Sequence, residues 1–530
     1  MSADRGHLFV MQGDLTRLAA DAYLVPCDGG GNVSRIWTGF VDEGGRWSNA
    51  RWFLPSGEVE WGTQSGPRLG FLPDPTPTGK ERLNPDEVVG LKVLVDTVTP
   101  QTIEAMVDHA LTAVTAAADR AEKHLGRHLP LVALPILGVS QGNFPGQRAA
   151  VVRKLVARLQ SYVVRNPIDV VLVMRHSTDF AAAQWARHLA EQEGTPGWPE
   201  LAERHTILAD ELGQRAAVGG LALFAGSGIS RPVGFPDWKG LLKEFGAWPD
   251  SEPTPEELEH LPREAQKLGL ADRKDDIAAR FRTTKHALAH GLLVGLRATA
   301  MVTTNYDSCL ENAAAGIPGY EPVVMVDRPA LGGKPWLLKL HGSETNTRTI
   351  VLAEDDYTQL KENFRAIRGV VQSLMLTNHL LFVGFGFAED DFLQMSEEVK
   401  KVRSLALEED RDVRVGTALG LTKKTPKFDE LTYEWMLDDG GDAVAAARLL
   451  EILLDRLAWR CQVSGEGRAA YLLDPEYERD GTGDDMGMRT ALLHLAAAAK
   501  QYPRSSAEEE VRLLLVGLGY FRGVSRRAPS

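Results

Sequence analysis

The fold is decided by residues 221–230, which read Leu221-Ala222-Leu223-Phe224-Ala225-Gly226-Ser227-Gly228-Ile229-Ser230. An apolar run that ends in a glycine-bearing turn is typical of the first strand of a parallel α/β sheet, where small residues let backbone N–H groups approach a pyrophosphate. Further apolar runs follow at residues 298–302, 336–340, 350–352 and 380–385. Because these runs do not alternate with polar residues, they predict parallel strands that are buried on both faces.

The chain around these apolar runs divides into three predicted parts. Residues 1–193 alternate short apolar runs with amphipathic stretches and predict a first α/β domain. Residues 194–422 predict a second, Rossmann-like α/β domain in which residues 251–282 form a helical insertion. Residues 423–530 predict a helical region that completes the second domain or mediates oligomerisation. We expect its apolar face to pack onto the preceding domain, with an oligomer contact as the alternative; that face comprises Leu449, Leu450, Leu453, Leu454 and Leu457.

Secondary structure in the first part follows the same pattern. Strands are predicted at residues 8–11, 22–26, 93–98, 131–135 and 170–174. Helices are predicted near residues 102–124, 147–163 and 180–192. Asp442 is predicted to cap the helix that carries the leucine face.

Composition excludes several classes of protein. The 530 residues exceed what one hydrophobic core supports, and the net charge of −13 gives no global basic field for nucleic acid or an anionic bilayer. Three dispersed cysteines, Cys27, Cys309 and Cys461, build neither a disulfide framework nor a Cys-x-x-Cys zinc site. No apolar run reaches the roughly 20 residues of a membrane span, and the first residues are polar. We therefore expect a cytoplasmic protein.

Polar side chains cluster directly after the apolar runs of the second domain. Residues 303–307 read Thr303-Thr304-Asn305-Tyr306-Asp307, residues 341–343 read His341-Gly342-Ser343, and residues 384–387 read Gly384-Phe385-Gly386-Phe387. Because the carboxyl ends of parallel strands share one edge of a sheet, these groups are expected to form one ligand site. Each also has a structural explanation: Gly-x-Gly turns are common, Asp307 could cap a helix, and a lone histidine in a loop is more often a satisfied polar residue.

Together these segments resemble the sirtuin-like domains of bacterial NAD-consuming defence proteins, over residues 221–392. The segments fall in the family's order. Residues 226–230 are similar to its Gly-Ala-Gly-x-Ser turn, residues 303–307 to Thr-Thr-Asn-Tyr-Asp, and residues 340–343 to Leu-His-Gly-Ser. The pattern Pro236-x-Trp238-x-x-Leu241-Leu242, the pair Asp356-Tyr357 and the downstream Asp391 also match. The departure is Gly386, where serine is usual, which could weaken contacts to the ribose.

The resemblance implies an NAD+ glycohydrolase that cleaves NAD+ to nicotinamide and ADP-ribose or a cyclic isomer. Asn305 would orient the ribose and the attacking water, and His341 would act as general base, since imidazole titrates near neutral pH. NAD+ is then a substrate, and no metal is expected. The residues implied to contact its ribose and phosphates are Gly226, Ser227, Gly228, Ser230, Asp307, Gly384 and Gly386.

Classical sirtuin deacylases carry a four-cysteine zinc module, which three dispersed cysteines cannot supply. This absence favours a hydrolase over a protein deacylase or an ADP-ribosyltransferase, and both stay open as alternatives. A non-catalytic ADP-ribose or NAD-binding regulatory module is the other alternative, against which the intact Asn305 and His341 count.

The first part of the chain resembles macro domains, the ADP-ribose-binding α/β module, over residues 6–190. Residues 12–16 read Gln12-Gly13-Asp14-Leu15-Thr16 and are similar to the first macro motif, residues 27–33 to its glycine-rich first loop, and residues 135–142 to its phosphate-binding second loop. Asp28 stands where enzymatically active members have asparagine, so we expect binding without turnover, or a fold that only scaffolds assembly. The implied signal-nucleotide site comprises Asp14, Leu15, Asp28, Gly29, Gly30, Gly138, Val139 and Gly142.

The two resemblances combine into a sensor and an effector. In defence systems of the Thoeris kind, a partner with a TIR domain makes an ADP-ribose-derived signal. By analogy, the macro-like domain is expected to bind such a nucleotide and to switch on NAD+ cleavage in a homo-oligomer. No membrane partner is expected. A nucleic-acid-triggered complex is a further alternative, and the acidic charge argues only weakly against it.

Overall fold

The apolar runs of residues 8–174 form one sheet whose centre is parallel. In this computed structural model the chain is described from Arg5 to Tyr520, apart from residues 29, 38–45, 49–50, 54–59, 62–68, 73–89, 122, 124, 141, 250–251, 255, 258–259, 327–332, 364, 387–394, 403–413, 424–427, 439–440 and 479–482. The parallel strands lie in the order β1-β10-β9-β2-β8, and β7 adds an antiparallel edge. The strands are β1 (Leu8–Gln12), β2 (Ala22–Cys27), β3 (Val33–Ser34), β4 (Arg46–Ser48), β5 (Arg51–Phe53), β6 (Glu60–Trp61), β7 (Leu69–Leu72), β8 (Leu91–Asp96), β9 (Leu131–Leu134) and β10 (Asp169–Met174).

Helices cover both faces of this N-terminal sheet. Because successive side chains of a strand point to opposite faces, neighbouring residues of β1 belong to different cores. Leu8 and Val10 of β1 belong to the core formed with α2 (Ile103–Arg120) and α3 (Arg148–Val163). Phe9 and Met11 belong instead to a core shared with α10 (Leu288–Gly295) and α15 (Ala443–Ser464). The predicted α/β character of this region is confirmed. Its five predicted strands and three predicted helices are present, and α4 (Ser177–Gln192) is the third helix.

The second sheet is parallel throughout and has the order β13-β14-β12-β11-β15-β16-β17. The chain builds outward from β11 on one side and then crosses to β15 on the other, so a topological switch point lies between β11 and β15. Its strands are β11 (Leu221–Ala225), β12 (Ala300–Thr303), β13 (Val323–Met325), β14 (Trp336–Lys339), β15 (His379–Val383), β16 (Gly416–Thr422) and β17 (Leu431–Leu437).

Helices flank the second sheet and fill the predicted insertion. Phe224 and Phe382 face α13 (Arg365–Thr377), whereas Leu223 and Leu381 face the core that contains α15. Short helices of the insertion pack together beside the sheet, as predicted for residues 251–282. The remaining helices are α5 (Glu203–Ala217), η4 (Ser227–Val233), α6 (Trp238–Glu244), α8 (Leu261–Lys267), α9 (Lys274–Arg280), α11 (Cys309–Ala315), α12 (Glu354–Asn363), α16 (Gly483–Gln501) and α17 (Glu508–Gly517).

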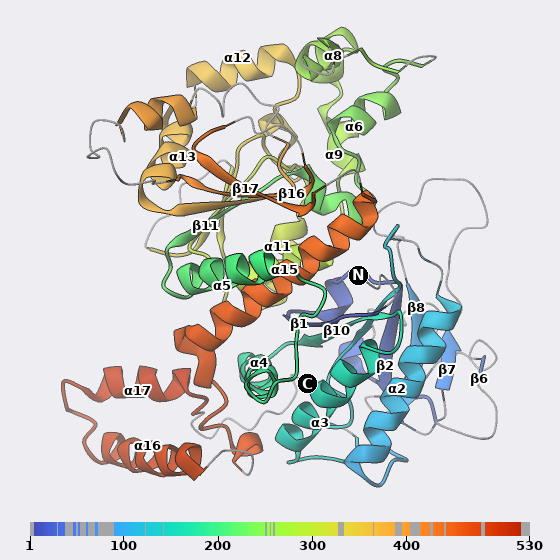
Figure 1. Cartoon of the computed structure of the whole chain (residues 1–530), viewed down its shortest axis with the longest axis vertical. Helices are drawn as coiled ribbons and strands as arrows, with labels where there is room; N and C mark the ends of the chain where they lie inside the picture. Colours follow the sequence, from blue (N-terminus) through green and yellow to red (C-terminus); the bar gives the residue numbers. More distant parts are fainter. Residues whose placement is uncertain are drawn as a thin grey trace.

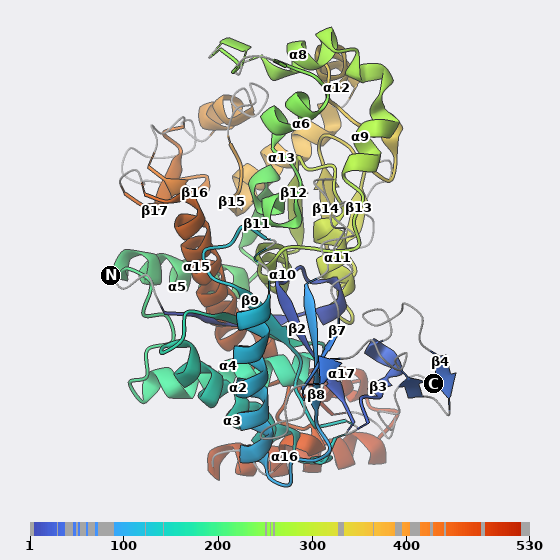
Figure 2. The same cartoon turned by 90° about the vertical axis from the view of Figure 1, so that its right-hand side faces the viewer.

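One helix joins the two units. α15 crosses between the N-terminal sheet and the second sheet, and α16 and α17 lie beyond its far end (Figure 1). It contacts β1 and α4 of the first unit and α5, α10, β16 and β17 of the second. Figure 2 shows α10 between the strands of the two sheets. The hydrophobic core is therefore continuous from one unit to the other.

A backbone contact also links the units next to α10. Leu18 and His286 form a parallel bridge, in which Ala19 N donates to His286 O at 2.9 Å and His286 N donates to Arg17 O at 2.8 Å. The Lys285 ammonium donates to Thr16 O at 2.7 Å. The first loop of the N-terminal unit is thus held directly against the segment that leads into α10.

One strand predicted in the second half of the chain is absent, and two further expectations concern its C-terminal part. Residues 350–352 are not a strand: Ile350 and Leu352 are buried against the insertion helices, because a short apolar run serves a buried loop as well as a strand. Residues 423–530 are mostly helical, with α15, α16 and α17. They also contain β17, which pairs with β16 and completes the second sheet. The leucine face of α15 is internal and packs within the core of the chain, which is the packing expected for it.

Asp442 caps α15 as predicted, accepting a hydrogen bond from Val444 N at 2.9 Å. In the part of the chain that the structure describes, no helix combines the length and the apolar character needed to cross a bilayer.

Candidate functional site

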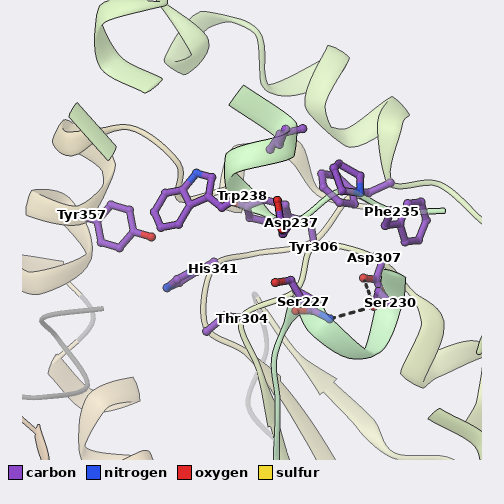
Figure 3. A pocket seen from close by; sticks show the side chains of 14 residues that line it. Ser227, Ser230, Phe235, Asp237, Trp238, Thr304, Tyr306, Asp307, His341 and Tyr357 are labelled. Carbon is purple, nitrogen blue, oxygen red and sulfur yellow. Dashed lines mark hydrogen bonds between the residues drawn. The ribbon is translucent and has the colours of Figure 1, made fainter. Parts of the chain in front are cut away.

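A pocket opens at the carboxyl edge of the second sheet. Its volume is about 550 Å³, including the open mouth. Figure 3 shows Phe235, Asp237 and Trp238 along one side, Ser227, Ser230 and Thr304 along the other, and His341 beside Tyr357 at one end. The full lining is Ser227, Ser230, Phe235, Pro236, Asp237, Trp238, Leu241, Phe281, Thr304, Asn305, Tyr306, Asp307, His341 and Tyr357.

The strand register explains why these residues meet. Ala225 of β11 pairs with Thr303 of β12, and Thr303 pairs with Lys339 of β14, so the three strands end level with one another. The Thr303 hydroxyl donates to Ala225 O at 2.9 Å and accepts from Asn305 N at 3.0 Å. The turn that carries Asn305 is therefore fixed to the end of β11.

The Asn305 side chain has a determined orientation. Its Nδ2 donates to Gly226 O at 3.2 Å and to Ser230 Oγ at 3.1 Å. Because a carbonyl oxygen can only accept, Nδ2 must face Gly226 and Oδ1 must be the other end of the amide. Among the residues that the structure describes, Oδ1 has no hydrogen-bond partner although Asn305 is only 7% exposed. A buried acceptor without a partner is costly, so this atom is suited to a ligand hydroxyl or a water.

Behind Asn305, a buried network fixes Ser230. Ala287 N donates to His290 Nδ1 at 3.2 Å, so Nε2 carries the proton and faces Ser230 Oγ at 3.2 Å. The Ser230 hydroxyl donates to Asp307 Oδ2 at 2.9 Å, and Asp307 Oδ1 accepts from Cys309 N at 3.0 Å. Burial lowers the pKa of His290 to about 4, which keeps the imidazole neutral and consistent with this tautomer.

His341 lies at the end of the pocket opposite Asp307 (Figure 3) and follows β14 directly. It is 6% exposed, and its ring meets the Tyr357 ring edge-on with centroids 5.4 Å apart. The Trp238 ring stacks on the Tyr357 ring, with centroids 6.0 Å apart. The Asp356 carboxylate accepts from Leu352 N and Ala353 N and pairs with Lys274, and thereby fixes the start of the helix that carries Tyr357. The pocket thus has an aromatic wall beside its histidine.

The predicted glycines lie behind the pocket and are not among its lining residues. Gly226 N donates to Val383 O and Gly228 N donates to Gly384 O, both at 3.0 Å. A Cβ at Gly226 would lie 2.5 Å from Gly384 O, so these glycines let the two strand ends at the switch point approach each other. Gly386 is exposed, and Asp391 lies outside the described residues.

His290, Asp307 and Cys309 offer a group of possible metal ligands, with donor atoms within 4.8 Å of one another. Their polar atoms are paired as described above, and burial raises the pKa of the Cys309 thiol, which opposes the thiolate that a metal would need. The protein residues therefore satisfy one another at this point. The expectation that the site needs no metal stays a prediction.

The predicted signal-nucleotide residues lie at the carboxyl edge of the N-terminal sheet, after β1, β2 and β9. The Asp14 carboxylate caps a short 3-10 helix through Thr16 N at 2.9 Å and lies 3.6 Å from Arg175. The Asp28 carboxylate organises its own loop by accepting from Gly30 N and Asn32 N, both at 2.9 Å. Leu15 and Val139 are buried, Gly30 is exposed, and Gly29 lies outside the described residues.

Gly138 and Gly142 shape the loop after β9. Gly138 has φ +77°, a conformation that favours glycine, and a Cβ at Gly142 would lie 2.5 Å from Gly138 Cα. The three loops share one edge of the sheet, and their use as a nucleotide site stays a prediction.

Several lining residues were not among the predicted site residues. Trp238 and Tyr357 stood within quoted motifs but had no assigned role, and the aromatic density after the glycine turn at residues 235–238 was a signal for them. Phe281 had no signal in the sequence, since it comes from the insertion and reaches the pocket only through the packing of α9.

The comparisons with known proteins agree with this geometry. Residues 299–412, which carry Asn305 and His341, match the family model described as the SIR2-like domain. These residues, which belong to the parallel α/β sheet, are therefore similar to the SIR2-like domain.

Three curated bacterial proteins are similar to part of this chain. "Defense-associated sirtuin 2" of Bacillus subtilis is 22% identical over 205 residues, 36% of this chain and 20% of the relative. "NAD(+) hydrolase ThsA" of Cytobacillus dafuensis is 27% identical over 187 residues, 32% of this chain and 36% of the relative. "NAD(+) hydrolase ThsA" of Acinetobacter baumannii is 23% identical over 192 residues, 34% of this chain and 39% of the relative. The chain thus spans between one fifth and two fifths of the length of these relatives.

Among solved structures, the Oceanobacillus iheyensis macrodomain with MES bound has a TM-score of 0.22 and 12% sequence identity, and the match covers 36% of this chain and 96% of the other. The macro-like character of residues 1–193 stays a prediction.

Proposed function

We propose that this protein hydrolyses NAD+ to nicotinamide and ADP-ribose in bacterial anti-phage defence. The observation that carries the proposal is the buried, unpartnered Oδ1 of Asn305 inside a pocket that also contains His341. The curated names of the SIR2-like relatives, two of them NAD+ hydrolases, support the same activity.

The pocket residues suit the chemistry of N-glycosidic cleavage. The bond from ribose C1′ to the nicotinamide nitrogen breaks with its electron pair leaving on nicotinamide, and a water oxygen bonds to C1′. Asn305 Oδ1 accepts from the water or a ribose hydroxyl and orients it, while His341 takes the proton that the water loses. The aromatic side chains of Trp238 and Tyr357 offer flat surfaces for a planar ring and exclude bulk water.

The N-terminal unit is the proposed sensor. It would bind an ADP-ribose-derived signal nucleotide, supplied by a TIR-domain partner, at the loops after β1, β2 and β9. Its first loop is bonded to the segment before α10, and that helix carries His290 beneath Ser230. The loop and the NAD+ pocket are therefore linked by a short series of covalent and hydrogen bonds, so a signal nucleotide that shifts the loop would also shift residues at the pocket. The proposal also includes a cytoplasmic location and a homo-oligomeric assembly.

A protein deacylase or an ADP-ribosyltransferase would use the same pocket but would require an acceptor. The chain's three cysteines are all buried and form no disulfide, and three cysteines cannot supply a four-cysteine zinc module to frame an acyl-lysine channel.

The test is NAD+ consumption by the purified protein, with nicotinamide and ADP-ribose quantified, alone and with a panel of ADP-ribose derivatives and cyclic isomers. Turnover that rises with one derivative is the expected result. Constitutive turnover would keep the hydrolase and remove the sensor. Release of nicotinamide only in the presence of an acylated peptide or a protein acceptor would replace this proposal with a deacylase or transferase function. Release under no condition would replace it with a non-catalytic binding function.

A further inference from the structure

Lys339 is a buried cation that the mechanism above does not use. It is the last residue of β14, and its side chain is 0% exposed. A buried ammonium is strongly unfavourable unless every proton has an acceptor. The placement of this lysine therefore needs an explanation in its contacts.

Its three protons have three acceptors. Nζ donates to Asp307 O at 2.5 Å, to Tyr306 O at 3.1 Å and to Glu311 Oε1 at 2.9 Å. Two of these acceptors are backbone carbonyls of the turn that follows Asn305. Glu311 is on α11, and its side chain is 22% exposed. Its carboxylate therefore balances the positive charge of Lys339 from the solvent side.

The lysine stands between the two proposed catalytic residues. It is paired in register with Thr303, two residues before Asn305, and it lies two residues before His341 in the chain. The same two turns are tied at two further points, by Leu340 N to Thr303 O at 2.9 Å and by Glu344 N to Tyr306 O at 3.0 Å. Of these ties, only the lysine reaches the carbonyl of Asp307, whose carboxylate holds Ser230.

We propose that Lys339 is a positioning residue: it fixes the turn of residues 304–307 against the end of β14 and so sets where Asn305 lies relative to His341. This inference rests on the proposed NAD+ hydrolysis. Turnover depends on the placement of reacting groups more steeply than binding does, because a displacement of about 1 Å can lower the rate about 100-fold. Loss of the lysine should therefore change kcat more than KM.

The test compares Lys339→Met and Lys339→Arg with Lys334→Met. Methionine keeps the unbranched side chain up to Cε without its donors, and arginine keeps the charge and donors. Lys334 is an exposed lysine just before the same strand. For each full-length variant, kcat and KM for NAD+ and the thermal unfolding midpoint would be measured under the conditions that activate the wild type.

We expect Lys339→Met to lower kcat by about 10- to 100-fold with KM within about twofold of wild type. Lys339→Arg should recover part of kcat, and Lys334→Met should match wild type. If Lys339→Met does not fold, Glu311→Gln and Lys339→Arg carry the test: Glu311→Gln leaves both carbonyl contacts in place and should retain kcat within about threefold, whereas Lys339→Arg should lose more.

The outcomes separate the two proposals. A wild-type kcat in folded Lys339→Met, or a loss confined to KM, overturns the positioning role and leaves NAD+ hydrolysis intact. A loss of kcat in Glu311→Gln that equals or exceeds that in Lys339→Arg also overturns it. Absence of NAD+ loss in the wild type overturns the proposed function and this role together.

Discussion

Asn305 shows how one side chain can be fixed by the protein at one end and left available for a ligand at the other. Its Nδ2 is held by Gly226 O and Ser230 Oγ, while Oδ1 is buried without a partner in the described chain, in a residue that lines the pocket. A preorganised acceptor of this kind needs no rearrangement when the substrate arrives.

Replacing either proposed catalytic residue should stop the reaction without unfolding the protein. In Asn305→Ala and in His341→Ala, NAD+ loss should fall by at least about 100-fold, because each removes a polar group that acts on water or ribose in the transition state. Both residues follow strand ends and lie outside the hydrophobic clusters, so circular dichroism spectra should stay unchanged. Nicotinamide release is the measurement, and full activity in either variant would show that the site is assigned to the wrong residues.

At the scale of elements, the approach of β11 to β15 depends on glycine. A Cβ at Gly226 would lie 2.5 Å from Gly384 O and 2.6 Å from Phe385 Cα. Gly384 itself has φ +67°. The two strand ends could not keep their present separation with any larger residue at position 226.

Gly226→Ala should therefore lower the free energy of unfolding by about 1–3 kcal/mol, as overpacking usually does, and should displace the carbonyl that orients Asn305. Gly386→Ala is the matched control, since no atom of the described residues lies within 4 Å of a Cβ at that position. Urea unfolding and NAD+ turnover would be measured for both. Equal stability of the two variants would contradict the role given to this close contact.

How far the sequence predicts each element depends on whether its signal is local. β11, β12, β14 and β15 were predicted because each is a continuous apolar run that ends in a polar turn. β16 and β17 were missed, since their partners are each other and β15, and Gly416 and Gly420 weaken the strand pattern. In the pocket, Ser230, Asn305 and His341 lie within five residues of the end of a strand, whereas the position of Phe281 depends on tertiary packing that no local pattern encodes.

At the scale of the whole molecule, a buried ionic network joins β1 of the N-terminal unit to α15. The Asp455 carboxylate on α15 accepts from Arg187, Trp198 and Val10 N, and lies 3.2 Å from His7 Nε2. His7 Nδ1 lies 3.3 Å from Glu200. Burial alone would lower the pKa of His7, but the two carboxylates raise it to about 8.

This histidine should make stability depend on pH. Because its folded pKa lies above the unfolded value of about 6.5, its contribution is fully present below pH 6.5 and is lost as the pH rises through 8. Between pH 6.5 and 9 the wild type should lose about 2 kcal/mol of unfolding free energy relative to His7→Gln, which cannot titrate. Chemical denaturation across this range is the measurement, and parallel curves for the two proteins would rule the effect out.

Signal dependence should be separable from the catalytic pocket. Gly138 has φ +77°, and a Cβ there would meet Phe144 at 3.2 Å, so Gly138→Leu should distort the loop after β9. We expect the activation by a signal nucleotide to fall by at least about tenfold while NAD+ turnover without signal is retained. Loss of NAD+ binding to the second unit in this variant would contradict the division into sensor and effector.

The core shared through α15 and α10 bears on how this protein could be re-engineered. Phe9, Met11 and Leu18 of the N-terminal unit are buried in the same cluster as Leu453 and Leu454 of α15. Excising residues 1–193 would expose part of this shared core to water, so a truncated protein should aggregate and its inactivity would say nothing about regulation. Exchanging the sensor for one of different ligand specificity would likewise need a replacement with the same apolar underside. Altering the loops of the resident unit is the route that keeps the fold intact.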